Sequence, residues 1–218
     1  MTAVASRPAL RGVSHAIAAA LALFGAVWLY AIAGSAGEYV SAAIYSTSLL
    51  LLLSFSATYH SRSWGASAGR LLRRIDHSMI FLLIAGSYTP FCLLALGTGW
   101  GLTILTVVWS LAAAGIFVKV FWIDSPRWIG VLLYLGVGWL AVTAAPATAA
   151  SLSGPTAAAL LAGGVLYTAG AVVYALRRPD PVPAVFGYHE VFHLFVIAGA
   201  CAHYAAVVSL FIDGPELG

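Results

Sequence analysis

Residues 39–60 read YVSAAIYSTSLLLLLSFSATYH, a run of 22 residues without Asp, Glu, Lys or Arg. The hydrocarbon core of a bilayer is about 30 Å thick, and a helix needs roughly 20 apolar residues to cross it. This run has that length and composition, and it ends on a histidine, His60. It predicts a membrane-spanning helix.

The rest of the 218-residue chain has the same character. Apolar residues make up 62% and charged residues 8%, and the mean hydropathy is +0.98. Soluble domains are about 25% charged because their surface faces water. These values exclude a soluble domain, a disordered chain, a coiled coil and a collagen, and they predict an all-α integral membrane protein. The two cysteines, Cys92 and Cys201, form no recognisable motif.

Seven runs of sufficient length lie between clusters of Gly, Pro, Ser or charged residues. We therefore expect one seven-helix membrane domain over residues 1–218. The expected spans are residues 12–34, 39–60, 75–96, 101–122, 128–146, 155–176 and 186–212. The first run is longer than the apolar region of a signal peptide, so we expect it to remain as a span.

All ten Lys and Arg residues fall on one side of such a seven-span chain. They are Arg7, Arg11, Arg62, Arg70, Arg73, Arg74, Lys119, Arg127, Arg177 and Arg178. The other side carries Glu38, Asp213 and Glu216. Because basic loops stay in the cytoplasm, we expect a cytoplasmic N-terminus and a C-terminus outside. The charges require no nucleic-acid partner; membrane lipids are the expected partners, and residues 70–74 are expected to rest on anionic headgroups.

Ionisable side chains in membrane spans are rare and costly, so each is a candidate functional residue. Seven of them are expected at the cytoplasmic ends of the spans: His15, His60, Asp76, His77, His189, Glu190 and His193. His203 is ten residues deeper than His193, or about 15 Å along a helix.

His189 and His193 are four residues apart, so on a helix their imidazoles point to one side. Two such histidines can bind one metal ion, and zinc suits imidazole ligands. The stretch also has the zincin pattern His-Glu-x-x-His, with Glu190 as general base. That chemistry needs a further acidic ligand, and the candidate Asp213-Gly214 is expected at the far membrane face, so we disfavour an intramembrane metalloprotease.

The second span offers a better third ligand, because Ser56 and His60 share one face at its cytoplasmic end. Asp76 opens the third span. Three histidines with water in the fourth position are typical of a catalytic zinc site, and a nearby carboxylate can hold and deprotonate that water.

Three separated motifs carry these residues. They are Ser56-x-x-x-His60, the run from Asp76-His77-Ser78 to Tyr88-Thr-Pro-Phe91, and Gly187-Tyr-His-Glu-Val-Phe-His193. Together they resemble the hemolysin III family, the bacterial branch of the progestin and adiponectin receptor superfamily. The resemblance implies a seven-span protein of the bacterial inner membrane that binds zinc through His60, His189 and His193. It also implies that Asp76 holds the zinc-bound water and that Ser56 donates a hydrogen bond beside it.

The other polar residues have less certain roles from sequence. His15 is a candidate to line the same cavity, and we expect His77 to face a neighbouring helix. The superfamily's receptors have Gln in place of Glu190, so this residue is either catalytic or a solvated interfacial charge. For His203, a proton relay and an interhelical hydrogen bond are equally open.

Three functions remain open. Similarity to ceramidase-like members of the superfamily implies a zinc-dependent hydrolase of a lipid amide that contributes to membrane homeostasis, with Asp76 and Ser56 as catalytic residues. The alternative is a non-enzymatic, receptor-like regulator of membrane fluidity with a structural zinc ion. A cytolytic pore ranks last, because the sequence shows no polar stripe or ring of charges for a conducting path.

Overall fold

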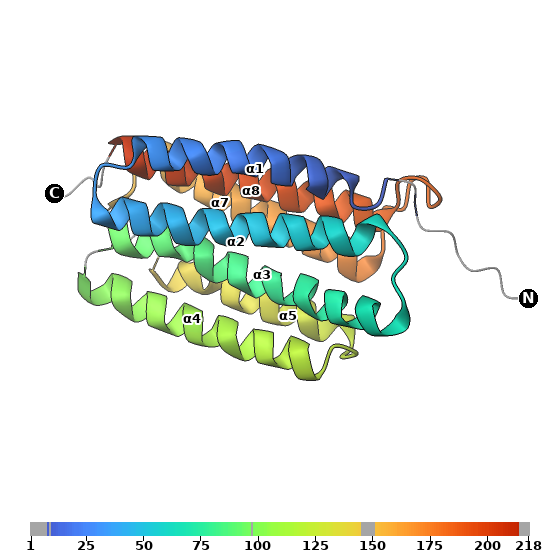
Figure 1. The fold of residues 1–218 in the computed structure, drawn as a ribbon. Helices are drawn as coiled ribbons and strands as arrows, with labels where there is room; N and C mark the ends of the chain where they lie inside the picture. The colour runs from blue at the N-terminus through green and yellow to red at the C-terminus, as the bar shows by residue number, and fades with distance from the viewer. Residues whose placement is uncertain (1–7, 9, 97, 145–150, 214–218) are drawn as a thin grey trace, which may run out of the picture.

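The computed structural model describes residues 8, 10–96, 98–144 and 151–213, and this part of the chain forms a helical bundle (Figure 1). Its elements are α1 (Val13–Ile32), α2 (Ala36–Ser61), α3 (Ala66–Leu94), α4 (Thr98–Phe121), α5 (Arg127–Gly138), the 3-10 helix η1 (Trp139–Ala144), α7 (Gly154–Leu176) and α8 (Tyr188–Asp213). Within the described ranges, six helices are long and apolar enough to cross a membrane: α1, α2, α3, α4, α7 and α8. Each of them coincides with a predicted span.

The helix α3 starts nine residues before its predicted span, at Ala66 rather than at residue 75. No proline or glycine cluster interrupts the chain after Gly69, so the basic segment 70–74 continues the helix instead of forming a loop. The three arginines of this segment therefore lie on the first turns of α3.

The helix found in the fifth predicted span, residues 128–146, is shorter than that span. The helix α5 ends after 12 residues at Gly138, and the chain continues as a 3-10 helix to Ala144. Pro146, the predicted end, lies outside the described residues. The Tyr88 hydroxyl donates to the carbonyl of Gly138 (2.7 Å) and accepts from the N–H of Ala141 (2.7 Å). It thus satisfies backbone groups where the helix changes type, as an apolar environment requires.

The order of packing brings the last helix back to the first. Consecutive helices pack side by side from α1 to α4, α7 packs along α8, and α8 also contacts α1 and α3 (Figure 1). As a result, the first turns of α8 lie near the start of α1 and the end of α2. These three helices supply most of the site described below.

We call one end of the bundle the histidine end; there α1, α3, α5 and α8 begin and α2, α4 and α7 end. Nine of the ten Lys and Arg residues belong to this end, and the tenth, Arg7, lies outside the described residues. Glu38 lies at the opposite end, in the first turn of α2. The predicted segregation of basic residues is therefore present in the fold.

The start of α1 depends on a glycine. Gly12, the residue before the helix, has a φ of +86°, and a Cβ added to it would lie 3.1 Å from the carbonyl oxygen of Ala57 on α2. Side chains rarely tolerate this backbone conformation. Gly12 thus allows the start of α1 to lie directly against the end of α2.

We predict that Gly12→Ala lowers the stability of the detergent-purified protein by about 1–3 kcal/mol, because it combines a strained φ with a close contact. Thermal unfolding measures this. The matched control is Gly136→Ala on α5, where an added Cβ meets nothing within 4 Å. Equal unfolding temperatures for the two variants would contradict the role assigned to Gly12.

Candidate metal centre

Three histidines from two helices meet at the histidine end. They are His60 near the end of α2, and His189 and His193 on the first turns of α8. One ring nitrogen of each lies within 4.8 Å of the others. The structure thus brings together the three residues that the sequence suggests as ligands.

The spacing of the three rings suits a metal ion. The Nε2 atoms of His60 and His189 are 3.2 Å apart. Two nitrogens bound to one tetrahedral zinc ion at about 2.0–2.1 Å each lie roughly 3.3 Å from one another. His60 and His193 are buried and His189 is half-buried, so the donor set is largely shielded from competing water. These three residues fit a metal ion that takes imidazole nitrogens as ligands, as zinc does.

The orientation of α8 is fixed by hydrogen bonds at its first turn. The Asp180 carboxylate accepts from the N–H of Tyr188 (2.7 Å), and the Glu190 carboxylate accepts from the N–H of Gly187 (2.8 Å). These bonds satisfy amide groups that have no partner inside the helix. The start of α8 is thereby fixed, and its histidines face α2.

Asp76 of α3 lies beside the three histidines. It is buried, and its Oδ2 is 3.9 Å from His60 Nε2 and 3.3 Å from His77 Nδ1. His77 is the next residue on α3, and its expected packing against a neighbouring helix stays a prediction. A carboxylate buried among apolar helices needs a charged or polar partner, and His77 supplies one.

Two further predicted residues lie next to this group. The ring of His15 on α1 stacks on that of His193, with centroids 3.8 Å apart and planes 8° apart, so His15 does reach the cluster. Ser56 is buried on α2, one turn before His60. Its role as a hydrogen-bond donor stays a prediction.

His203 lies outside the cluster. Its Nε2 donates to the carbonyl oxygen of Leu160 on α7 (3.1 Å), and its ring contacts Tyr167 of the same helix. A carbonyl oxygen only accepts hydrogen bonds, so this contact favours the interhelical bond over a proton relay.

Glu190 is buried and paired rather than solvated. Its side chain is only 3% exposed, so the expectation of a solvated charge is wrong. One carboxylate oxygen accepts from Arg11 Nε (2.7 Å) and the other from the N–H of Gly187 (2.8 Å). With both oxygens occupied, the residue joins the chain before α1 to the start of α8. Asp213 ends α8, 24 residues beyond His189, and Gly214 lies outside the described residues.

Sequence reasoning missed this ion pair and two aromatic contacts. Tyr59 packs against His60, and Tyr174 of α7 against His189, with ring centroids 4.6 and 5.8 Å apart. A signal for the ion pair was present, because Arg11 and Glu190 are opposite charges at the same predicted ends of the first and last spans. No sequence pattern indicates the contacts that the two tyrosines make.

Comparison with known proteins gives a consistent result. The family model described as "Haemolysin-III related" matches residues 4–204. The chain is similar to a Hemolysin-3 homolog of Bacillus subtilis (strain 168), with 36% identity over 208 residues and 94% of each chain covered. It is 33% identical to Hemolysin-3 of Bacillus cereus over 211 residues, covering 95% of this chain and 93% of that one. A human Monocyte to macrophage differentiation factor is 26% identical over 208 residues, covering 93% and 83%.

We predict that Arg11→Met destabilises the protein by about 3 kcal/mol, because it leaves the buried Glu190 carboxylate without its cation. Thermal unfolding in detergent measures the loss. The double variant with Arg11→Met and Glu190→Gln should recover part of it, since the unpaired charge is then absent. A double variant that is as unstable as the sum of the two single variants would contradict a direct coupling.

Proposed function

The chain belongs to the haemolysin-III-related family, and from this membership and the geometry of its histidine cluster we propose that it is a zinc-dependent membrane hydrolase that cleaves the amide bond of a lipid and contributes to membrane homeostasis. One observation carries the proposal. Three imidazole nitrogens lie within 4.8 Å of one another, with a buried carboxylate 3.9 Å from one of the rings, between helices long enough to cross a membrane. Ionisable groups in such a place are costly and usually functional.

The ligands in this proposal are His60, His189 and His193. These three residues would hold a zinc ion, which would supply Lewis-acid chemistry toward a substrate carbonyl and lower the pKa of a water. Asp76 Oδ2 takes up the proton of the attacking water and later delivers it to the departing amine nitrogen. His77, 3.3 Å from that oxygen, holds the carboxylate in position.

The surroundings favour a lipid as the substrate. The cluster lies between apolar helices at the histidine end, where the amide of a membrane lipid would be located. Ser56 donates a hydrogen bond to the substrate in this arrangement. The burial of His60, His193 and Asp76 keeps bulk water from the reacting atoms.

A structural zinc ion is the competing function, and the fold gives it one specific support. The three ligands come from two helices, α2 and α8, which are distant in sequence. A metal ion would tie these helices together whether or not it turns over a substrate. The protein would then regulate membrane fluidity without catalysis.

We further propose that α5 and η1 complete a seventh crossing and that the histidine end faces the cytoplasm of a bacterium, at its inner membrane. Nine described basic residues lie at this end, as the positive-inside rule requires of a cytoplasmic face. The apolar stretch Arg127–Thr143 is short for a crossing. A bilayer accommodates a short span by local thinning, and α5 packs against α3, α4 and α7.

For the hydrolase, we predict that His189→Ala abolishes both bound zinc and hydrolysis of ceramide, used as the probe amide. Asp76→Asn should keep the zinc and lower the rate by about 10²–10⁴-fold, the usual contribution of a general base. Metal analysis and amine release by the purified protein measure the two properties.

His203→Ala is the matched control, because this histidine lies on the same helix outside the cluster and should leave both properties unchanged. Hydrolysis by metal-free protein would rule the mechanism out. Full activity of Asp76→Asn together with retained zinc would deny Asp76 the role of base, and zinc without amide hydrolysis in the unmodified protein would favour the structural ion.

For the topology, we predict that protease added to intact spheroplasts removes a tag fused after residue 218. A tag that becomes accessible only after lysis would show an even number of crossings and would exclude α5 with η1 as a full span. A tag at the N-terminus provides the opposite control, because it should be protected until lysis.

A further inference from the structure

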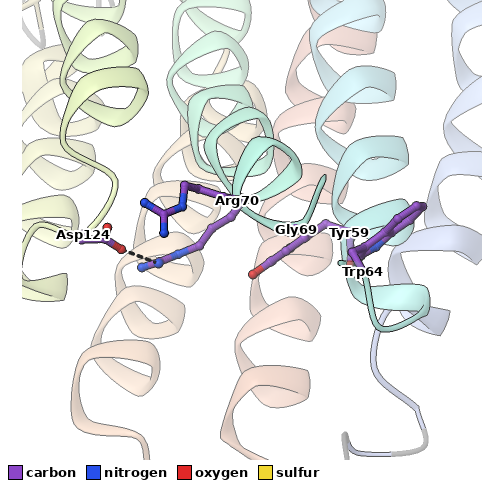
Figure 2. A pocket seen from close by; sticks show the side chains of 6 residues that line it. Tyr59, Trp64, Gly69, Arg70 and Asp124 are labelled. Carbon is purple, nitrogen blue, oxygen red and sulfur yellow. Dashed lines mark hydrogen bonds and ion pairs between the residues drawn. The ribbon is translucent and has the colours of Figure 1, made fainter. Parts of the chain in front are cut away.

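A second polar site lies at the histidine end. Tyr59, which packs against His60, borders it. The site is an open pocket of about 250 Å³, lined by Tyr59, Trp64, Gly69, Arg70, Arg73 and Asp124. We call it the basic pocket. It lies between the end of α2, the first turns of α3 and the turn from α4 to α5. Figure 2 shows Tyr59 and Trp64 on one side and Arg70 and Asp124 on the other.

The lining of the basic pocket has an excess of positive charge. Asp124 is its one acidic residue, and Arg73 Nη1 already pairs with that carboxylate at 3.0 Å. Arg70 forms no ion pair with any residue in the described part of the chain. The guanidinium of Arg70 is therefore available to an external anion.

A buried lysine contacts Ser125, the chain neighbour of the lining residue Asp124. Lys119 on the last turn of α4 is only 3% exposed, and its Nζ lies 3.4 Å from Ser125 Oγ and 5.6 Å from the centre of the Tyr134 ring. Within the described ranges no carboxylate lies within ion-pair distance of it.

The aromatic wall is held in place before any ligand arrives. The indole N–H of Trp64 donates to the carbonyl oxygens of Thr58 (3.3 Å) and Tyr59 (3.2 Å). The guanidinium of Arg62 lies over the Trp64 ring, 4.1 Å from its centre. Tryptophan and arginine side by side are typical of the headgroup layer of a membrane.

We propose that the basic pocket binds an anionic phosphate group, with the guanidinium of Arg70 as its main donor. The planar guanidinium matches two phosphate oxygens with two parallel hydrogen bonds. Two sources present this chemistry at the histidine end, a phospholipid headgroup and free phosphate. The site needs no metal ion and stands independently of the hydrolase proposal.

The test uses the full chain in nanodiscs of phosphatidylcholine, with and without phosphatidylglycerol, and native mass spectrometry of the lipids that it retains. Arg70→Gln should lower retention of phosphatidylglycerol about tenfold, as loss of a charge-assisted hydrogen bond predicts. Asp124→Asn should raise it severalfold, because the variant removes the only negative charge of the lining and releases Arg73. Arg178→Gln is the matched control. Arg178 is a basic residue at the same end but outside this pocket, so its replacement should leave retention of phosphatidylglycerol unchanged.

A second arm adds inorganic phosphate to the detergent-solubilised protein and follows binding by calorimetry. The proposal is supported if the protein binds phosphatidylglycerol or phosphate and Arg70→Gln weakens that binding as predicted. The arm in which binding is weakened identifies the source. Retention that is the same in the Arg70→Gln and Arg178→Gln variants overturns it, as does an absence of binding in both arms. Thermal unfolding of each variant separates lost binding from lost folding.

Discussion

A charged or polar side chain that lies between apolar helices must find its partner inside the bundle, and the layout of the histidine end follows from this requirement. Leaving a buried carboxylate unpaired costs several kcal/mol, more than a typical single interaction supplies. Glu190 is therefore paired with Arg11, and Asp76 lies against His77 and near His60. Each of these contacts joins residues of different helices or fixes a ring beside the cluster.

The same requirement explains why the first and last helices meet. Arg11 comes just before α1 and Glu190 lies on the first turn of α8, so their ion pair joins segments 179 residues apart. Gly12 lets the start of α1 lie against the end of α2, and His15 then reaches the ring of His193. The candidate metal centre is thus built from α1, α2, α3 and α8, while the turn between α4 and α5 borders the basic pocket with the end of α2 and the start of α3.

Much of this could be predicted from the sequence, because lipid as the solvent limits the choices. Apolar runs of about 20 residues and the segregation of Lys and Arg locate the helices and their common end. The i, i+4 spacing of His189 and His193, and the position of His60 at a span end, bring three histidines to one layer. The short α5 could not be predicted, since the backbone at its end is hydrogen-bonded by the Tyr88 hydroxyl, from a residue about 50 positions away in the sequence. The stacking of His15 on His193 and the contact of His77 with Asp76 likewise depend on side-chain packing, which no periodic pattern in the sequence indicates.

The two acidic residues near the histidines illustrate how burial and partners assign roles that sequence leaves open. Glu190 stands between two candidate ligands in a His-Glu-x-x-His pattern, which favours it as a general base on sequence grounds. In the fold, Arg11 and the N–H of Gly187 each donate to one oxygen of Glu190, so the carboxylate joins the chain before α1 to the start of α8. Asp76 has no motif of this kind, yet its Oδ2 lies 3.9 Å from His60 Nε2, close enough to meet a water that approaches the cluster. The residue with the stronger motif therefore pairs with Arg11 at the helix start, and the residue with the weaker one lies beside the histidines.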